Sequence, residues 1–383
     1  MRAPAAINIA ELRELARRRV ARIAFDYLEG GCDDEECLER NQAAFHAYRL
    51  LPRYLVDVST RDRSVTLLGR TYAGPIGVAP TGIAGFFRRG GDILIARAAV
   101  RCDVPFILSG TSNASIETIA EIAPAHAWYQ LYAARDRRIS EDMIRRAQDA
   151  GIATLVLSAD APVRSNRERN IRNAWPSPLG RNTRIVLEAL AHPGWLIDYV
   201  RGRHELRLDN WAPYSPSPEK VAVGHFFFEQ TPFPGLTWRE LEGFRRLWRG
   251  NLVVKGILHP ADAVRAADGG ADGIIVSNHG GRQLDRAPAP IDVLPAIRAA
   301  VGRRLAVMVD SGVRRGADVA IALCLGADYV FVGRAVLYGA AAAGYAGAVR
   351  ALTLLNEELD LVMGQIGCPS VTMLGRDFLF ETD

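Results

Sequence analysis

The chain has 383 residues, 49% of them hydrophobic, and a formal net charge of +4 at pH 7. Its length exceeds that of a typical single domain but suits barrels built from alternating strands and helices. The charge is mild for this length, and no basic stripe is interleaved with aromatic residues, so nothing indicates a nucleic-acid partner. Binding of an anionic substrate or cofactor is enough to account for the small excess of positive charge.

The number and spacing of the cysteines predict a protein of a reducing compartment and give no indication of a metal site. They form no Cys-x-x-Cys pair and have no metal-ligand spacing with a histidine. The first residues lack an apolar signal core, and no run approaches the ~20 apolar residues of a membrane span. We therefore expect a cytoplasmic protein, which can still rest on a membrane surface. The cysteines are Cys32, Cys37, Cys102, Cys324 and Cys368.

The predicted elements begin with a helical stretch over about residues 8–48, for which Asn8 is a suitable cap. After Arg53, short apolar runs alternate with polar stretches of helical character, such as residues 139–150 and 261–270. The apolar runs predict buried strands. They are residues 75–80, 104–109, 127–132, 154–158, 251–255, 273–277, 305–310 and 328–333.

Strand–helix alternation implies a parallel sheet, and about eight such units are what a closed barrel needs. We therefore predict an α/β fold, a TIM (β/α)8 barrel, that forms a single domain over residues 1–383. The expected additions are an N-terminal helical segment over residues 1–60 and a long lid insertion after strand 4 over residues 170–237.

The insertion is too long for an ordinary connection, and loops of this length are usually lids or binding segments. It includes an expected helix near residues 183–199 and the aromatic run Phe226, Phe227 and Phe228. A surface excursion with a small local core is an equally good interpretation. Its prolines are Pro176, Pro178, Pro193, Pro213, Pro216, Pro218, Pro232 and Pro234.

Polar residues follow the predicted strands, at the carboxyl-terminal end of the barrel where such folds place their activity. One polar strand end means little, but most of a full set is hard to explain by packing. These residues are Pro80, Thr81, Gly82, Ser109, Gln130, Tyr132, Ser158, Asp160, Lys255, Ser277, His279, Asp310, Gly333 and Arg334.

The loops after strands 7 and 8 indicate a phosphate site, since phosphate often binds there in these barrels. They read Asp310-Ser311-Gly312-Val313-Arg314-Arg315-Gly316 and Gly333-Arg334. Glycines expose backbone N–H groups, and arginines supply positive charge. A tight turn with solvated arginines is the alternative.

The motif Ser277-Asn278-His279-Gly280-Gly281-Arg282-Gln283-Leu284-Asp285 places a base and a fixed cation at one strand end. His279 can take a proton near neutral pH, Arg282 can grip a carboxylate, and the glycines allow close backbone approach. Chemistry on a small carboxylic acid is indicated. A structural histidine is the commoner case, but Arg282 on the same loop and Asp160 at another strand end favour a base. Lys255 either holds an anion or extends to solvent. A Schiff-base lysine is a third possibility, but no other feature of the sequence supports it.

This motif resembles the signature of the FMN-dependent 2-hydroxy acid oxidases and dehydrogenases. That family includes glycolate oxidase, lactate oxidase, lactate dehydrogenase and mandelate dehydrogenase. The resemblance covers nearly the whole chain and is greatest to the mandelate dehydrogenase branch. The segments that carry it are Phe25-Asp26-Tyr27, Pro80-Thr81-Gly82, Leu108-Ser109, Thr111-Ser112-Asn113-Ala114-Ser115-Ile116-Glu117, Arg167-Glu168-Arg169, Asp310-Ser311-Gly312-Val313-Arg314-Arg315-Gly316 and Gln365-Ile366-Gly367-Cys368.

The resemblance implies an FMN cofactor across the barrel mouth. The implied contacts to its ring are Pro80, Thr81, Gly82, Ser109, Gln130, Ser158 and Lys255, and those to its ribityl chain and phosphate are Ser277, Asp310, Gly312, Arg314, Gly333 and Arg334. The implied substrate carboxylate lies between Arg167 and Arg282, helped by the hydroxyls of Tyr27 and Tyr132.

The resemblance also implies the catalytic roles. His279 is the base and Asp160 its partner, because a carboxylate raises a neighbouring histidine's pKa. Lys255 stabilises negative charge on the reduced flavin. Carbanion and hydride-transfer routes both remain open.

Four positions depart from the plant glycolate oxidase pattern. Gly82 stands in place of alanine, Thr111 in place of a large aromatic residue, Leu28 in place of a second tyrosine and Ser158 in place of threonine. The smaller residues favour a bulky substrate side chain, such as a phenyl group, which Phe86 and Phe87 can help to line. They also favour a dehydrogenase that passes electrons to a quinone or a protein over an enzyme that reacts rapidly with oxygen.

The expected activity is therefore the oxidation of an (S)-2-hydroxy acid, mandelate-like or lactate-like, to the 2-keto acid. The alternatives are an oxidase that uses oxygen and makes hydrogen peroxide, or oxidation of a hydroxy or amino acid unit within a modified peptide. A catalytically silent flavin-binding protein is disfavoured, since it need not keep His279, Arg282, Arg167 and Tyr132. Relatives imply a homotetramer and, through the lid loop, a peripheral contact with the inner face of the cell membrane.

Overall fold

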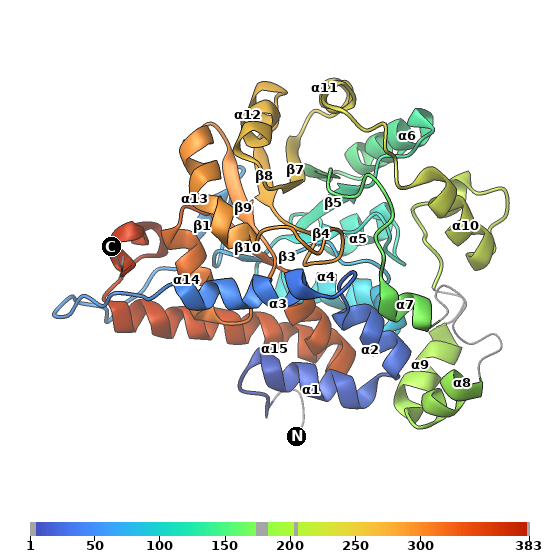
Figure 1. Cartoon of the computed structure of the whole chain (residues 1–383), viewed down its shortest axis with the longest axis horizontal. Coiled ribbons are helices and arrows are strands. Elements are labelled where there is room, and N and C mark those ends of the chain that lie inside the picture. The colour runs from blue at the N-terminus through green and yellow to red at the C-terminus, as the bar shows by residue number, and fades with distance from the viewer. Residues whose placement is uncertain (1–4, 174–182, 203–205, 381–383) are drawn as a thin grey trace.

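The computed structural model describes residues 5–173, 183–202 and 206–380. Eight parallel strands close into a barrel in the order β10-β3-β4-β5-β6-β7-β8-β9 (Figure 1). This confirms the predicted TIM barrel, and each predicted apolar run forms one strand. The strands are β3 (Ile76–Val78), β4 (Phe106–Leu108), β5 (Ala127–Leu131), β6 (Thr154–Ser158), β7 (Asn251–Ile257), β8 (Gly273–Val276), β9 (Ala306–Val309) and β10 (Tyr329–Val332).

Helices between the strands cover the outside of the barrel. In α6 (Arg137–Asp149), Ile139, Met143, Ile144 and Ala147 recur at helical spacing and are buried, so one face of the helix packs on the sheet. The other covering helices are α4 (Gly91–Arg101), α5 (Ile116–Ile122), α11 (Trp238–Leu247), α12 (Pro260–Asp268), α13 (Pro290–Val301), α14 (Gly316–Cys324) and α15 (Arg334–Ile366).

Large side chains fill the interior of the barrel, among them Trp128, Tyr329 and Phe331. Gly77 makes room for this packing, because a Cβ there would lie 2.6 Å from the ring of Phe331. An antiparallel hairpin of β1 (Val65–Leu67) and β2 (Arg70–Tyr72), which the sequence analysis did not predict, adds Leu67 and Tyr72 to this inner cluster.

The N-terminal stretch forms α1 (Ile9–Arg19), α2 (Arg22–Glu29), α3 (Glu36–Ala43) and the 3-10 helix η2 (Ala44–Ala47). Asn8 caps α1 as predicted, and its side chain accepts a hydrogen bond from the Glu11 N–H. These helices lie within the stretch that was predicted to be helical, and the structure divides it into separate elements. The chain turns between α2 and α3, where a Cβ on Gly31 would lie 2.8 Å from the Gly281 carbonyl, so this turn docks on the motif loop.

Helix α15 lies between α1 and α4 (Figure 1) and breaks at Ala343 and Gly344, whose backbone angles are not helical. By length and composition it is the one helix in the described part of the chain that could cross a membrane. However, 67% of its most apolar window is buried within the fold. It is therefore a core helix, and its two halves approach closely enough that a Cβ on Gly339 would lie 2.1 Å from the Gly347 carbonyl.

The segment between β6 and α11 contains α7 (Glu168–Arg172), α8 (Thr183–Leu190), α9 (Pro193–Gly202), the 3-10 helix η4 (Ala212–Tyr214) and α10 (Lys220–Gln230). The helix predicted near residues 183–199 is two helices, because a new one begins at Pro193. Of the predicted insertion, residues 174–182 and 203–205, with Pro176 and Pro178, lie outside the described residues, as do residues 1–4 of the N-terminal segment. Short 3-10 helices η3 (Ala84–Phe86), η5 (Val371–Met373) and η6 (Arg376–Phe378) complete the fold.

Candidate active site

A cavity of about 520 Å³ opens at the carboxyl-terminal ends of the barrel strands. Most of the residues singled out from the sequence line it: Tyr27, Pro80, Thr81, Gly82, Ser109, Tyr132, Arg167, Lys255, His279, Arg282, Asp310, Gly312, Arg314, Gly333 and Arg334. Gln130, Ser158, Asp160 and Ser277 do not line it, but each bonds to or neighbours a residue that does. The fold thus gathers the whole predicted set at one end of the barrel.

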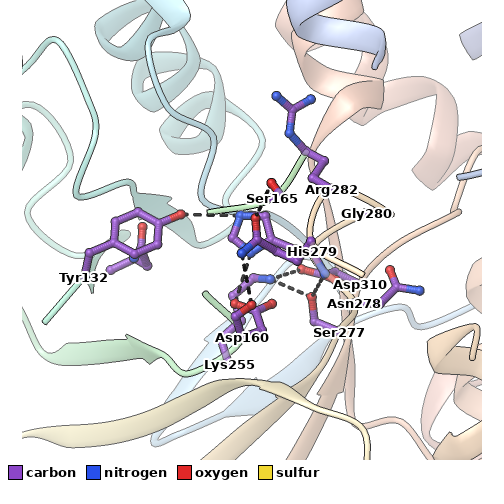
Figure 2. A network of polar contacts seen from close by, with 12 residues as sticks. Tyr132, Asp160, Ser165, Lys255, Ser277, Asn278, His279, Gly280, Arg282 and Asp310 are labelled. Atoms are coloured by element: carbon purple, nitrogen blue, oxygen red, sulfur yellow. Dashed lines mark hydrogen bonds and ion pairs between the residues drawn. The ribbon is translucent and has the colours of Figure 1, made fainter. Parts of the chain in front are cut away.

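His279 is held by both of its ring nitrogens (Figure 2). Nδ1 lies 3.0 Å from Asp160 Oδ1, and Nε2 lies 3.4 Å from the Tyr132 hydroxyl. The backbone of His279 is left-handed, with φ 58°, an uncommon conformation for a residue with a side chain. Its N–H donates to Ser277 Oγ. This geometry fixes the imidazole with Nε2 toward the Tyr132 side of the cavity.

Asp160 reaches His279 because Gly256 has no side chain. A Cβ on Gly256 would lie 2.4 Å from the Asp160 Cβ, and Gly256 has a φ of +99° that side chains disfavour. The strand register also shifts at this point of β7, between Lys255 and Ile257. Asp160 Oδ2 is buried with no hydrogen-bond partner among the described residues.

The charges of this pair are set by burial and by each other. Burial lowers the pKa of His279 below its ordinary value, although Asp160 opposes the shift. For Asp160, burial acts to raise the pKa, but the nearby His279 and Lys255 outweigh it and the pKa is lowered. Near neutral pH the pair is therefore a neutral imidazole, able to accept a proton, beside an ionised carboxylate.

Lys255 is buried at the end of β7, with its side chain 4% exposed. Its Nζ lies 3.0 Å from Asp310 Oδ2 and donates to Ser277 Oγ at 2.6 Å (Figure 2). Burial acts to lower the pKa of Lys255, but Asp310 and Asp160 outweigh it and the pKa is raised. A fixed cation therefore lies at the floor of the cavity.

Two arginines, Arg167 and Arg282, line the same cavity as His279. Arg282 Nη1 donates to the carbonyls of Tyr27 and Gly30, and its guanidinium lies 5.2 Å from the Tyr27 ring centre. Arg167 Nη2 donates to Gln283 Oε1 at 3.0 Å. Burial, followed by the charges of Arg167 and Arg334, lowers the pKa of Arg282. This concentration of positive charge favours a bound anion.

The loops after β9 and β10 meet at the same cavity. Gly312 has a φ of +89°, and a Cβ there would lie 1.9 Å from the Asn41 carbonyl, so only glycine fits. Arg334 donates to the carbonyls of Gly280 and Gly30. Arg314 donates to the Val313 carbonyl and lies over the Tyr338 ring.

Sequence reasoning missed two residues that organise the site. Gln283 joins Arg167 to the Asp160 loop, since its Nε2 donates to the Asp160 carbonyl at 3.2 Å. Gly256 leaves the space for Asp160. Gln283 lies within the motif and could have been weighed as a clamp, whereas a single glycine inside a strand carries no signal of what lies opposite it.

A closed α/β barrel with a buried histidine–carboxylate pair, a buried lysine and convergent arginines is typical of an enzyme that acts on a small anion. The sequence profile described as FMN-dependent dehydrogenase matches residues 16–381, and the chain belongs to that family. It is accordingly an FMN-dependent oxidoreductase of 2-hydroxy acids.

Several relatives are similar over nearly their whole length. The chain is 40% identical over 373 residues to (S)-mandelate dehydrogenase of Pseudomonas putida, which covers 97% of this chain and 93% of that protein. It is 40% identical over 374 residues to L-lactate dehydrogenase of Caulobacter vibrioides, with 98% and 97% covered. A crystal structure of the monotopic membrane protein (S)-mandelate dehydrogenase superposes with a TM-score of 0.94 at 39% identity, covering 99% of this chain and all of that one.

The buried polar atoms beside the cavity fit the FMN. Gln130 Oε1 accepts hydrogen bonds from the Gly110 N–H and Ser109 Oγ, but Gln130 Nε2 and Ser158 Oγ have no partner among the described residues. Buried polar groups are rarely left unpaired. The edge of a flavin ring carries alternating carbonyl and nitrogen atoms and would satisfy both groups.

Proposed function

We propose that the protein oxidises an (S)-2-hydroxy acid with a bulky or aromatic side chain to the 2-keto acid, with His279 as the base. The observation that carries this proposal is the His279–Asp160 pair at 3.0 Å beside Arg167 and Arg282. Oxidation removes the hydroxyl proton, the α proton and one electron pair. When bound, FMN accepts the electrons, which no side chain can do.

In this proposal His279 accepts a proton at Nε2, on the side of the Tyr132 hydroxyl. Asp160 then stabilises the imidazolium, because an adjacent carboxylate favours the charged form. Arg167 and Arg282 hold the substrate carboxylate, with the hydroxyls of Tyr27 and Tyr132. This fixes which face of the substrate is presented to the base.

The same proposal assigns the cofactor contacts. Ser109, Gln130 and Ser158 would hold the ring edge, the backbone of Pro80, Thr81 and Gly82 would contact the ring, and Lys255 would supply positive charge beside it. Ser277, Asp310, Gly312, Arg314, Gly333 and Arg334 hold the ribityl chain and phosphate. The loops after β9 and β10 support the phosphate contacts, because their glycines and arginines line the cavity together.

The apolar wall of the cavity supports a bulky substrate. Phe86 and Phe87 line it together with Tyr27, and the Tyr27 and Phe87 ring centres lie 6.1 Å apart. Gly82 and Thr111 also line the cavity, and they lie so close together that a Cβ on Gly82 would fall 2.1 Å from Thr111 Oγ1. A substrate with a phenyl or similarly large side chain suits this wall better than a 2-hydroxy acid that has only hydrogen in that position.

The decisive experiment is anaerobic reduction of the purified, yellow protein with a panel of hydroxy acids. We expect mandelate or lactate to bleach the flavin absorbance, and the His279→Ala variant to keep its flavin but lose bleaching. Normal turnover in that variant would refute the assigned base. Hydrogen peroxide formed in step with substrate loss under air would identify an oxidase; its absence, with turnover restored by a quinone, would identify a dehydrogenase.

The insertion supports a peripheral contact with the inner face of the cell membrane. Helices α8 and α9 lie together at one corner of the molecule (Figure 1) and expose apolar side chains. Leu187 and Leu190 are 68% and 58% exposed, and Ile197 and Val200 are 51% and 52% exposed. The relative described as monotopic supports the same placement, and a membrane quinone is then a convenient electron acceptor.

We further propose a homotetramer, which sedimentation of the purified protein would test.

A further inference from the structure

Two buried tryptophans of the insertion bond to the two loops that wall the active site. Trp195 on α9 donates its indole N–H to the Phe86 carbonyl at 2.8 Å. Trp211, just before η4, donates to the Gly110 carbonyl at 2.9 Å. Both side chains are fully buried, and neither lines the cavity. An indole N–H is a donor only, so each bond fixes both the ring and the carbonyl that it meets.

Trp195 supports the substrate wall from behind. Its ring packs edge-on against Phe86, with centres 5.7 Å apart, and stacks on Tyr199 at 5.2 Å. On the same helix, Asp198 forms ion pairs with Arg19 and Arg88. Helix α9 is therefore tied to the Phe86–Phe87 wall by a hydrogen bond, aromatic packing and charge.

Trp211 supports the loop that carries Ser109. Gly110 donates its N–H to Gln130 Oε1, so the carbonyl bonded by Trp211 belongs to a peptide next to the proposed flavin edge. Asn210 secures the same loop, since it accepts from the Ile116 N–H and donates to the Ala114 carbonyl. The Trp211 ring also packs against Phe227, 5.1 Å away.

We propose that Trp195 and Trp211 are positioning residues, through which the insertion sets the shape of the active site. Trp195 fixes the wall against which the substrate side chain packs, a part of the proposal that rests on the proposed function. Trp211 fixes the loop that presents Ser109 and Gln130 to the FMN ring. The insertion is then a structural wall of the site, in addition to any role as a lid.

The test compares Trp195→Phe and Trp211→Phe with Trp248→Phe. Trp248 is a matched control, because its buried indole N–H donates to the Asn251 carbonyl at 2.7 Å at the start of β7, away from the cavity. Each variant keeps an aromatic ring and loses one buried hydrogen bond. Dissociation constants of phenylacetate and acetate are read from the flavin absorbance of the holoenzyme, and FMN release from the fluorescence of free flavin after dilution.

For Trp195→Phe we expect phenylacetate to bind about tenfold more weakly, with acetate binding and FMN release unchanged. For Trp211→Phe we expect FMN release to be about tenfold faster and the flavin absorption maximum to shift, with the ratio of the two dissociation constants unchanged. Trp248→Phe should match the wild type in all three readouts, whatever its melting temperature.

A Trp195→Phe variant with the dissociation-constant ratio of Trp248→Phe would overturn the role of Trp195. A Trp211→Phe variant that releases FMN no faster than Trp248→Phe would overturn the role of Trp211. If either variant fails to fold, Asp198→Asn replaces Trp195→Phe and Asn210→Ser replaces Trp211→Phe, since these substitutions loosen the same two segments. Asp198→Asn should then weaken phenylacetate binding, and Asn210→Ser should speed FMN release. Because both readouts are binding measurements, a wild type that oxidises no hydroxy acid would refute the proposed function and leave this test intact.

Discussion

The residues of the motif from Ser277 to Asp285 fall into two groups with different structural roles. Ser277 and His279 belong to the charged network of the cavity floor. Asn278 instead bonds to Asn41 on α3, and Asp285 Oδ1 accepts from the Cys37 N–H at the start of α3. The motif therefore holds the N-terminal segment against the barrel as well as presenting His279 to the cavity. This accounts for its length, which a base and a cation alone would not require.

Asp160 sets the basicity of His279, which gives a prediction for pH dependence. Burial already lowers the pKa of His279, and Asp160 opposes that shift. In Asp160→Asn the opposing charge is gone, so the pKa of His279 falls further. In the proposed mechanism activity requires neutral His279, so kcat/KM should rise with pH through this pKa. The variant's acid limb should therefore move to lower pH, while kcat drops by about 10²–10⁴-fold because the imidazolium loses its partner.

The measurement is a pH profile of kcat/KM for the wild type and for Asp160→Asn, with Asp103→Asn as a control. Asp103 also pairs with a histidine, His126, at 2.9 Å, but neither residue lines the cavity. An acid limb that moves upward in Asp160→Asn, or that moves equally in both variants, would contradict the role given to Asp160.

The sequence allowed us to predict which side chains gather at the strand ends, but not which residues from other segments they contact. His279 and Asp160 follow two strands of a parallel barrel, so their proximity follows from the alternation of elements. The role of Gly256 could not be predicted, because it depends on a side chain that arrives from a different loop. For the same reason nothing in the sequence showed that Arg334 donates to backbone carbonyls of two distant segments.

At the scale of elements, the buried strands were predictable because apolar runs of a parallel barrel are buried on both faces. The β1–β2 hairpin was not, since its strands are short and Thr66 and Thr71 face solvent. The break between α2 and α3 was missed because its cause is tertiary. Gly31 packs on the Gly281 carbonyl, and the Cys32 N–H donates to the same group.

Helix α3 gives a second prediction, because Asp285 serves as its cap from a distance. Its own N-cap residue, Glu35, makes no side-chain capping bond, and the buried Cys37 N–H depends on Asp285 Oδ1 at 2.9 Å. Asp285→Ala should lower the free energy of unfolding by about 1–3 kcal/mol, because that donor is left buried and unpaired. It should also speed FMN release, since α3 carries the Asn41 carbonyl against which Gly312 packs.

The matched control is Asn8→Ala, which removes the cap of α1 and should cost about 1 kcal/mol without touching the cavity. Chemical denaturation gives the stabilities, and fluorescence of released flavin gives the second readout. Equal FMN release in the two variants would show that α3 does not support the loop after β9 that contains Gly312.

At the scale of the whole molecule, the fold separates a buried chemical site from an exposed apolar surface on one insertion. Trp195 faces inward from α9, fully buried, while Ile197 and Val200 on the same helix are exposed. One short helix therefore contributes both to the active-site wall and to the outer surface. Single exposed apolar residues are ordinary on proteins, but a group of them on neighbouring helices marks a binding surface.

This surface gives the last prediction, for the double variant Leu187→Ser and Leu190→Ser on α8. Each leucine that enters a bilayer interface contributes roughly 1.5–3 kcal/mol at full burial, so the double variant should bind vesicles containing phosphatidylglycerol about 10²-fold more weakly. Co-sedimentation with the vesicles measures this. Leu55→Ser is the control, because Leu55 is fully exposed but lies outside the insertion. Turnover with a soluble acceptor should be unchanged in both, since neither site lines the cavity. If the double variant and Leu55→Ser bind the vesicles equally well, the apolar surface of α8 does not make the membrane contact.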